Sequence, residues 1–355
     1  MSIFTADNVG SFLRPAYLLE ARHQNLPPEQ LRPIEDRAIV EVLGLQEDVG
    51  LSVVTDGEFR RKLFFSTVVE VADGFDPEGY ERFHRDRTGN VERFGVPTPV
   101  QRLTRKAWLV DTEFRFVEQH ATLPIKVTMP SPSMFLNYWT AGRSDLAYPS
   151  KEAFLDDLIA IMNQDAKALA AAGVAYLQID APQYTYVGDP AIRPDVKDPA
   201  AELRRLLAND RRVLEGVSGV VTGLHLCRGN YKSKFTGSMP YAGWAEVVFE
   251  EAPFDRLLLE YDDERAGGFE PLRHLRSDMT AVLGLVTTKS PRLETRDELA
   301  RRIEAASRYV PIERLALSTQ CGFASVDEGN EISFDAQKAK LELVVETAEQ
   351  IWGAE

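Results

Sequence analysis

Short apolar runs alternate with amphipathic stretches along most of the chain. The runs end in polar residues and are predicted to be strands at eight places: residues 5–11, 53–58, 125–130, 176–182, 220–227, 256–262, 281–288 and 314–321. Stretches typical of helices separate most of them, at residues 29–48, 151–172, 200–215, 295–309 and 334–352. In residues 151–172, an apolar side chain recurs with the helical period, and Ser150 stands where an N-cap is expected.

Repeated strand–helix units predict a parallel sheet. Eight such units predict a (β/α)8 TIM barrel, formed by one domain over residues 1–355. An open, doubly wound sheet is the alternative. It would normally show a glycine-rich phosphate turn after the first strand, and Gly10 alone does not make one. Residues 68–118 are rich in charge, glycine and proline, and we predict that they form an insertion after the second strand.

The composition limits which kinds of molecule the protein is expected to bind and where it is expected to work. The chain has 355 residues and a formal net charge of -14, which argues against nucleic acid as a partner. No apolar run approaches the ~20 residues of a membrane-spanning helix, and residues 1–8 do not resemble a signal peptide. Two cysteines are too few for a disulfide framework, so we expect a cytoplasmic protein. The oligomeric state stays open, a homodimer included.

Three predicted strands end in residue types that bind metals, and the strand ends of a barrel meet at one mouth. His225 and Cys227 are two positions apart, so both can face one ion. Glu260 and Cys321 end two later strands. Two sulfurs, one imidazole and one carboxylate suit Zn²⁺ better than magnesium or calcium. Taken singly, each of these residues could have a structural role instead. The cysteines could be small buried residues, the histidine a hydrogen-bonded part of the core, and the glutamate the partner of a nearby arginine.

A catalytic zinc normally keeps one exchangeable position. We therefore expect one weak ligand, Glu260, to be displaced by an incoming group. A thiol suits this position, because zinc holds it as the reactive thiolate at neutral pH.

Four segments resemble the catalytic half of the cobalamin-independent methionine synthase family. They are His225-Leu226-Cys227 with Glu260 and Cys321-Gly322, Val9-Gly10-Ser11-Phe12, Asp56-Gly57-Glu58-Phe59-Arg60-Arg61, and Leu177-Gln178-Ile179-Asp180-Ala181-Pro182. The resemblance spans nearly the whole chain. It implies a zinc barrel that moves a methyl group from methyl-tetrahydrofolate to homocysteine. It also implies that Glu58 and Asp180 bind the homocysteine ammonium, with donors around Ser11 for the carboxylate.

The chain departs from the family pattern in several places. The full-length family enzyme has two barrels, whereas this chain can hold one. Ala181 stands where the family usually has a glutamate, Lys62-Leu63-Phe64 replaces an Asn-Asp pair, and Lys289 aligns with a histidine thought to act as an acid. The methyl donor is therefore left open between a folate and another compound. Related single-barrel proteins include an epoxide-opening transferase that acts on coenzyme M, which is the alternative function.

Transfer from a tertiary amine needs a proton on the leaving group. Lys289, Asp189 or Tyr184 could deliver it, and Lys289 could instead anchor an anionic tail of the donor or acceptor. Tyr138 and Trp139 could stack on a pterin ring or pack in the core. Two other classes of protein remain as alternatives: a zinc lyase or hydrolase, which more often uses several histidines, and a non-catalytic sensor or docking protein.

Overall fold

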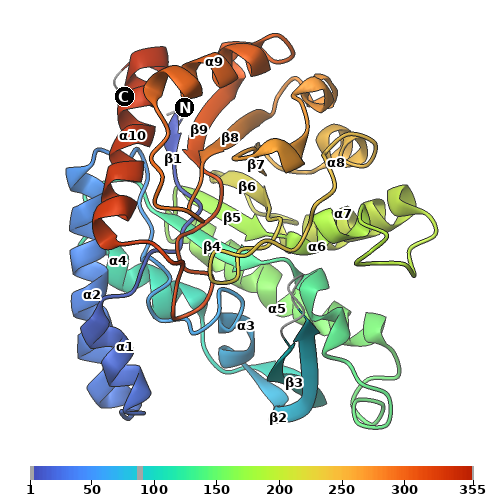
Figure 1. Cartoon of the computed structure of the whole chain (residues 1–355). Helices are drawn as coiled ribbons and strands as arrows, with labels where there is room; N and C mark the ends of the chain where they lie inside the picture. Colours follow the sequence, from blue (N-terminus) through green and yellow to red (C-terminus); the bar gives the residue numbers. More distant parts are fainter. Residues whose placement is uncertain (1–3, 86–90, 354–355) are drawn as a thin grey trace.

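The computed structural model describes residues 4–85 and 91–353 of the chain. Seven parallel strands form one curled sheet in the order β1-β9-β8-β7-β6-β5-β4 (Figure 1). The strands are β1 (Ala6–Asp7), β4 (Lys126–Pro130), β5 (Tyr176–Asp180), β6 (Val221–Leu226), β7 (Arg256–Glu260), β8 (Thr280–Val286) and β9 (Leu315–Thr319). The predicted parallel α/β fold is therefore confirmed.

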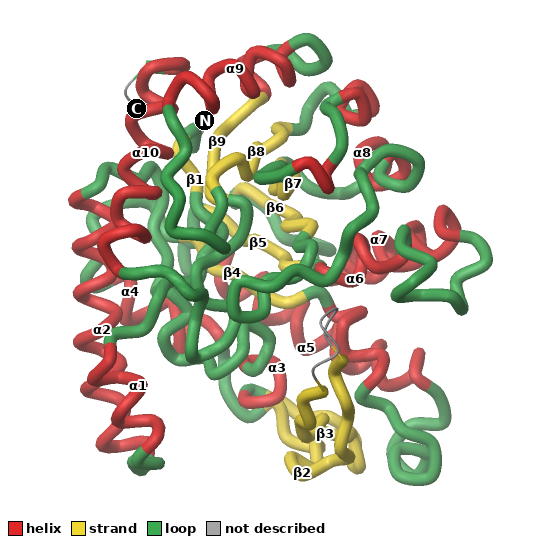
Figure 2. Tube along the Cα trace, in the orientation of Figure 1, coloured by secondary structure: helices red, strands yellow, loops and turns green. Residues whose placement is uncertain are grey.

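Helices surround the curled sheet (Figure 2). The longer ones are α1 (Ala16–His23), α2 (Pro28–Asp48), α5 (Lys151–Ala171), α7 (Pro199–Val213), α9 (Arg296–Ser307) and α10 (Phe334–Trp352). Short helices are α3 (Thr67–Glu70), α4 (Arg115–Glu118), α6 (Pro182–Val187) and α8 (Glu246–Glu251). The predicted cap is present, because the Ser150 hydroxyl accepts the Ala153 N–H at the start of α5. Apolar side chains between the sheet and the helices form the larger core.

The predicted strand at residues 53–58 differs from expectation. It is reduced to one parallel bridge, between Val54 and Ile125. Beyond Val54, the backbone is satisfied by a side chain rather than by a neighbouring strand: Gln46 accepts the Thr55 N–H at 2.9 Å and donates to the Thr55 carbonyl at 2.8 Å. Just before the segment, on its other side, the Ser52 N–H donates to the Ala6 carbonyl at 3.4 Å. The segment thus lies between β1 and β4 without forming a strand.

A smaller core fills the inside of the curled sheet. It comprises Phe4, Val9, Val53, Tyr176, Leu258, Val282 and Ala316. A buried ion pair crosses this interior, with the Lys126 ammonium 2.5 Å from an Asp7 carboxylate oxygen. Both side chains are fully buried, so each charge helps to offset the cost of burying the other.

The segment predicted as an insertion, residues 68–118, holds a separate two-stranded antiparallel sheet. Its strands are β2 (Ala72–Arg85) and β3 (Val91–Arg105), set apart from the main sheet (Figure 1). Residues 86–90 of this segment lie outside the described residues. The sequence pattern assigns no secondary structure to this segment, because charged residues, glycine and proline interrupt any alternation.

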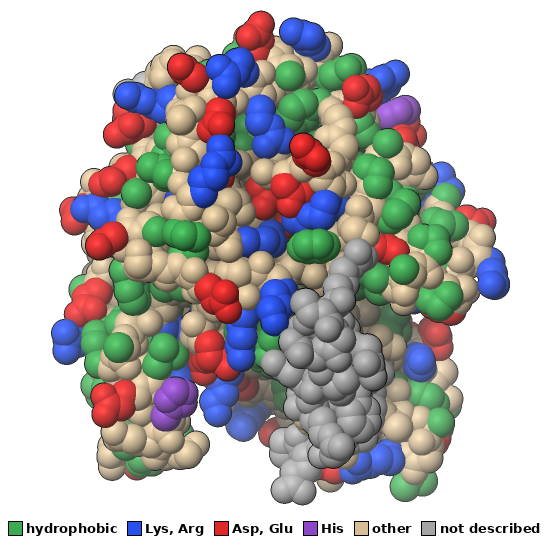
Figure 3. Space-filling model, in the orientation of Figure 1, with side chains coloured by type: hydrophobic (Ala, Val, Ile, Leu, Met, Phe, Trp, Pro, Cys, Tyr) green, Lys and Arg blue, Asp and Glu red, His purple; other side chains and the backbone are tan. Residues whose placement is uncertain are grey.

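Charges are mixed on the outside of the molecule. On the face shown in Figure 3, acidic and basic side chains are interspersed over its described part, without a continuous basic area. None of the helices formed by residues 4–85 and 91–353 is long and apolar enough to cross a membrane.

Candidate active site and metal centre

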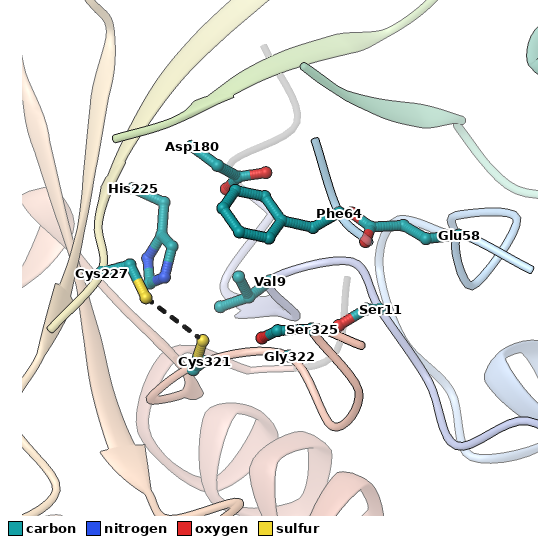
Figure 4. Close-up of a pocket in the computed structure, with 10 residues that line it drawn as sticks. All are labelled: Val9, Ser11, Glu58, Phe64, Asp180, His225, Cys227, Cys321, Gly322 and Ser325. Atoms are coloured by element: carbon teal, nitrogen blue, oxygen red, sulfur yellow. Dashed lines mark hydrogen bonds between the residues drawn. The ribbon is translucent and has the colours of Figure 1, made fainter. Parts of the chain in front are cut away.

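The four predicted metal ligands meet at the carboxyl ends of β6, β7 and β9. His225 lies in β6, Cys227 follows its last residue, Glu260 ends β7, and Cys321 lies two residues beyond β9. One ligand atom from each lies within 4.8 Å of the others. The two cysteine sulfurs face each other at 3.8 Å (Figure 4). Residues 94 positions apart in the sequence are thus in direct contact.

This geometry fits a zinc ion. Two thiolates bound about 2.3 Å from one ion in a tetrahedral arrangement lie about 3.8 Å apart, whereas a disulfide would hold the sulfurs at about 2.05 Å. His225 is 1% exposed, and neither of its ring nitrogens makes a well-formed hydrogen bond among the described residues; the ring instead has a weaker contact with the Cys321 sulfur. A buried imidazole with so weak a partner is costly, and a metal ion would use one of its nitrogens.

The sulfur pair favours one negative charge before any cation binds. The hydrogen bond from Cys227, together with His225, lowers the pKa of Cys321 well below that of an ordinary thiol. The same contact, together with burial, raises the pKa of Cys227. The contact between the two sulfurs therefore favours a single negative charge shared across the pair.

Glu260 is held by two donors. Its Oε1 accepts the Arg228 N–H at 2.8 Å, and its Oε2 lies 3.3 Å from the Lys289 ammonium. Lys289 also approaches Asp262, at 3.7 Å. Burial lowers the pKa of Lys289, but these carboxylates raise it overall, so the lysine stays charged. The structure pairs Lys289 with a candidate ligand, and its predicted roles as an acid or an anchor stay predictions.

Two buried carboxylates lie on another side of the same cavity. Glu58 follows Gly57 in a turn and adopts a φ of 59°, which is unusual for a residue with a β-carbon. Its Oε1 accepts the Thr128 hydroxyl at 2.6 Å and lies 3.3 Å from the Arg61 guanidinium. Its Oε2 has no partner among the described residues. Asp180 ends β5, and its Oδ1 accepts from the Gln178 amide at 2.8 Å.

Burial is the main influence on both carboxylates. It raises the pKa of Glu58 above its ordinary value, although Arg61 and Thr128 oppose the rise. It raises the pKa of Asp180 to about 7, with His225 lowering the pKa and Glu58 raising it further. A cation between the two carboxylates would favour the ionised form of both.

Ser11 closes the cavity beside Cys321. Its hydroxyl accepts the Ala324 N–H at 3.3 Å, and its carbonyl accepts the Phe323 N–H at 2.8 Å. A β-carbon added to Gly322 would lie 2.0 Å from this hydroxyl. Glycine at position 322 therefore lets the segment Val9-Gly10-Ser11-Phe12, which we call the serine loop, approach Cys321.

Most of these groups, though neither Glu260 nor Lys289, line one cavity of about 30 Å³ (Figure 4). Its lining is Val9, Ser11, Glu58, Phe64, Asp180, His225, Cys227, Cys321, Gly322 and Ser325. A larger cavity of about 330 Å³ adjoins it, and Phe64, Cys227 and Ser325 line both. The second cavity is mainly apolar, with Leu63, Phe65, Met134, Pro182, Tyr186, Tyr231 and Val326 among its lining. Cys227 thus lies where the two spaces meet.

Two predicted ligand-binding residues are not brought to either cavity. The Tyr138 ring packs edge-on against Phe135 at 5.0 Å, and the Trp139 indole N–H donates to the Tyr148 carbonyl at 3.0 Å. The sequence reasoning in turn missed Phe64 and Ser325. Both lie on loops and carry no metal-binding or charged group, so no local pattern indicated them.

Comparison with known proteins places the chain in a family. The family model described as "Cobalamin-independent synthase, Catalytic domain" matches residues 4–350. The chain belongs to the cobalamin-independent methionine synthase family. The predicted resemblance is therefore confirmed.

Relatives and solved structures agree with this assignment over nearly the full chain. The uncharacterized protein YxjG of Bacillus subtilis is 38% identical, over 98% of this chain and 95% of its own. A methionine synthase of Pyrococcus abyssi is 26% identical, over 92% and 88%. A putative vitamin-B12-independent methionine synthase from Listeria monocytogenes superposes with a TM-score of 0.75 at 29% identity, covering 99% and 98%. A B12-independent methionine synthase from Shewanella sp. W3-18-1, at 24% identity, has the same fold with a TM-score of 0.77, covering 98% and 97%.

Proposed function

We propose that this protein is a zinc-dependent S-methyltransferase that methylates homocysteine to methionine. The observation that carries the proposal is the set of residues that line the cavity. Its lining includes a pair of sulfurs with an imidazole and, separately, two buried carboxylates. A small thiol that also bears an ammonium group matches both parts at once.

The carboxylates also discriminate between acceptors. Glu58 and Asp180 would bind the ammonium of homocysteine through charge-assisted hydrogen bonds, which fix orientation strongly. The hydroxyls of Ser11 and Ser325 are available in the cavity for the substrate carboxylate. Coenzyme M carries a sulfonate and no ammonium, and no lysine or arginine is among the residues lining this cavity. Like-charge repulsion therefore disfavours the alternative acceptor.

His225, Cys227, Glu260 and Cys321 would hold the zinc ion. Bound there, zinc would supply a Lewis acid that lowers the pKa of the acceptor thiol. The chain's own groups contribute orientation: Glu58 and Asp180 fix the amino end, and the serine loop fixes the carboxylate end. Because Cys227 lies where the two cavities meet, the substrate sulfur held beside Cys227 and Cys321 would face the second cavity. Such positioning would supply much of the rate.

The methyl donor would occupy the second cavity. Its apolar and aromatic lining suits a flat ring better than a fully charged group. A folate-type donor fits this description, and so would another methylated ring compound.

We also propose that the fold is a complete (β/α)8 barrel with one insertion. The segment at residues 53–58 would act as the eighth member of a (β/α)8 barrel, since Val53 packs in the interior core and Val54 bridges Ile125. Residues 68–118 would be an insertion within this single domain of residues 1–355.

The test is a methyl-transfer assay with zinc-loaded protein. L-homocysteine and coenzyme M are offered separately with 5-methyltetrahydrofolate and with other methyl donors, and methylated product is measured by mass spectrometry. The proposal predicts methionine with at least one donor and no methylated coenzyme M. Methylation of coenzyme M alone, or of neither thiol with any donor, would contradict it.

A further inference from the structure

Gln178 lies in β5, two residues before Asp180, and is fully buried. Residues two apart on a strand point to the same side. Gln178 is therefore beneath the candidate active site, inside the curled sheet.

Its amide joins two parts of the cavity wall. The Nε2 group donates to Asp180 Oδ1 at 2.8 Å and to the Val9 carbonyl at 2.7 Å. The Oε1 atom accepts from the Lys126 ammonium at 3.0 Å. Val9 and Asp180 both line the cavity, one on the serine loop and the other on the sheet.

The direction of these bonds is fixed by chemistry. An ammonium can only donate, whereas a carbonyl and a carboxylate can only accept. A flipped amide would set its oxygen against two acceptors and its nitrogen against a cation. Lys126 is itself immobile, because it is buried and bound to Asp7 and to the Asn8 carbonyl.

We propose that Gln178 is a positioning residue for recognition of the substrate ammonium. This inference rests on the proposed function. The amide holds Oδ1 of Asp180 and leaves the other carboxylate oxygen for the ligand. By holding the Val9 carbonyl as well, it sets the distance between the serine loop and the aspartate, so that both ends of a thiol amino acid fit together.

The experiment measures binding directly, since the methyl donor is not needed. Zinc-loaded protein is titrated by calorimetry with L-homocysteine and with 4-mercaptobutanoate, which keeps the thiol and carboxylate but lacks the ammonium. Gln178→Met keeps the side-chain length and removes the amide. It should weaken homocysteine binding by about tenfold or more, as expected when a hydrogen bond to a charged group is lost. Binding of 4-mercaptobutanoate should change less than about twofold, because this ligand has no ammonium for Asp180 and so does not depend on the distance between the aspartate and the serine loop.

A double-mutant cycle with Asp180→Asn separates positioning from a structural role. In the Asp180→Asn background, Gln178→Met should no longer alter the preference for homocysteine. If Gln178→Met does not yield folded, zinc-binding protein, Gln178→Asn replaces it, because a shorter amide cannot span the same three partners.

Two failures are distinguishable. Wild-type protein that does not prefer homocysteine over 4-mercaptobutanoate would overturn the proposed function and this inference with it. A wild-type preference that survives Gln178→Met, or equal losses for both ligands, would overturn the role of Gln178 alone.

Discussion

Replacing Asp180 by asparagine is expected to make the protein more stable and worse at binding homocysteine. Burial raises the pKa of this carboxyl from an ordinary 3.8 to about 7. The folded state therefore resists ionisation of a group that ionises freely in the unfolded chain. A difference of this size corresponds to an upper limit of about 4 kcal/mol once the group is ionised in both states.

The sign follows from the two pKa values. Below about pH 4 the carboxyl is protonated in both states and has no effect on stability. As the pH rises toward about 7, only the unfolded state ionises, so the wild-type protein loses stability. Asparagine has no such dependence and can still accept the hydrogen bond from Gln178. The stability advantage of Asp180→Asn should therefore grow by about 1.4 kcal/mol between pH 6 and pH 8.

The assay is urea unfolding of both proteins at these two pH values, followed by homocysteine titration. Homocysteine affinity should fall about 10- to 100-fold, because a charge-assisted contact is lost. Asp210→Asn is the matched control, since burial also raises the pKa of Asp210 to about 7 and this residue lies outside both cavities. A constant stability difference at pH 6 and pH 8, or an equal loss of affinity in the control, would refute the reasoning.

Three further predictions concern the metal centre and its wall. Serine in place of Cys321 should reduce bound zinc from about one per chain to a small fraction, as measured by elemental analysis, and full retention would argue against ligation. Lys289→Met should lower the free energy of unfolding by about 3 kcal/mol without zinc, because buried Glu260 loses its counter-ion. The loss should be smaller with zinc bound. Urea unfolding with and without chelator measures both losses, and equal losses would contradict this. Gly322→Ala should weaken homocysteine binding at least about tenfold, because the added β-carbon would lie 2.0 Å from the Ser11 hydroxyl oxygen. Gly44→Ala is the control and should bind normally, because a β-carbon added there would meet no neighbouring group within 4 Å.

The sequence predicted the parallel sheet and most of its strands because their apolar runs are short and end in polar residues. β4 to β9 lie where these runs lie. The segment at 53–58 could not be judged this way, because beyond Val54 its backbone binds the Gln46 side chain in place of a neighbouring strand, and no local pattern indicates this contact.

The same distinction applies to the site. Residues with a chemical signature at strand ends, such as Cys227 and Cys321, were predictable and do meet in space. Phe64 and Ser325 reach the cavity from loops, so only the folded chain reveals them. Gln178 was visible in the sequence as part of a motif, but its bonds to Lys126 and Val9 join three separate segments.

The most direct measurement is zinc K-edge X-ray absorption of the zinc-loaded protein with and without L-homocysteine. We expect two sulfur neighbours at about 2.3 Å before homocysteine is added and three afterwards, with one nitrogen or oxygen neighbour lost. An unchanged count of two sulfurs, or a protein that retains no zinc, would contradict the account.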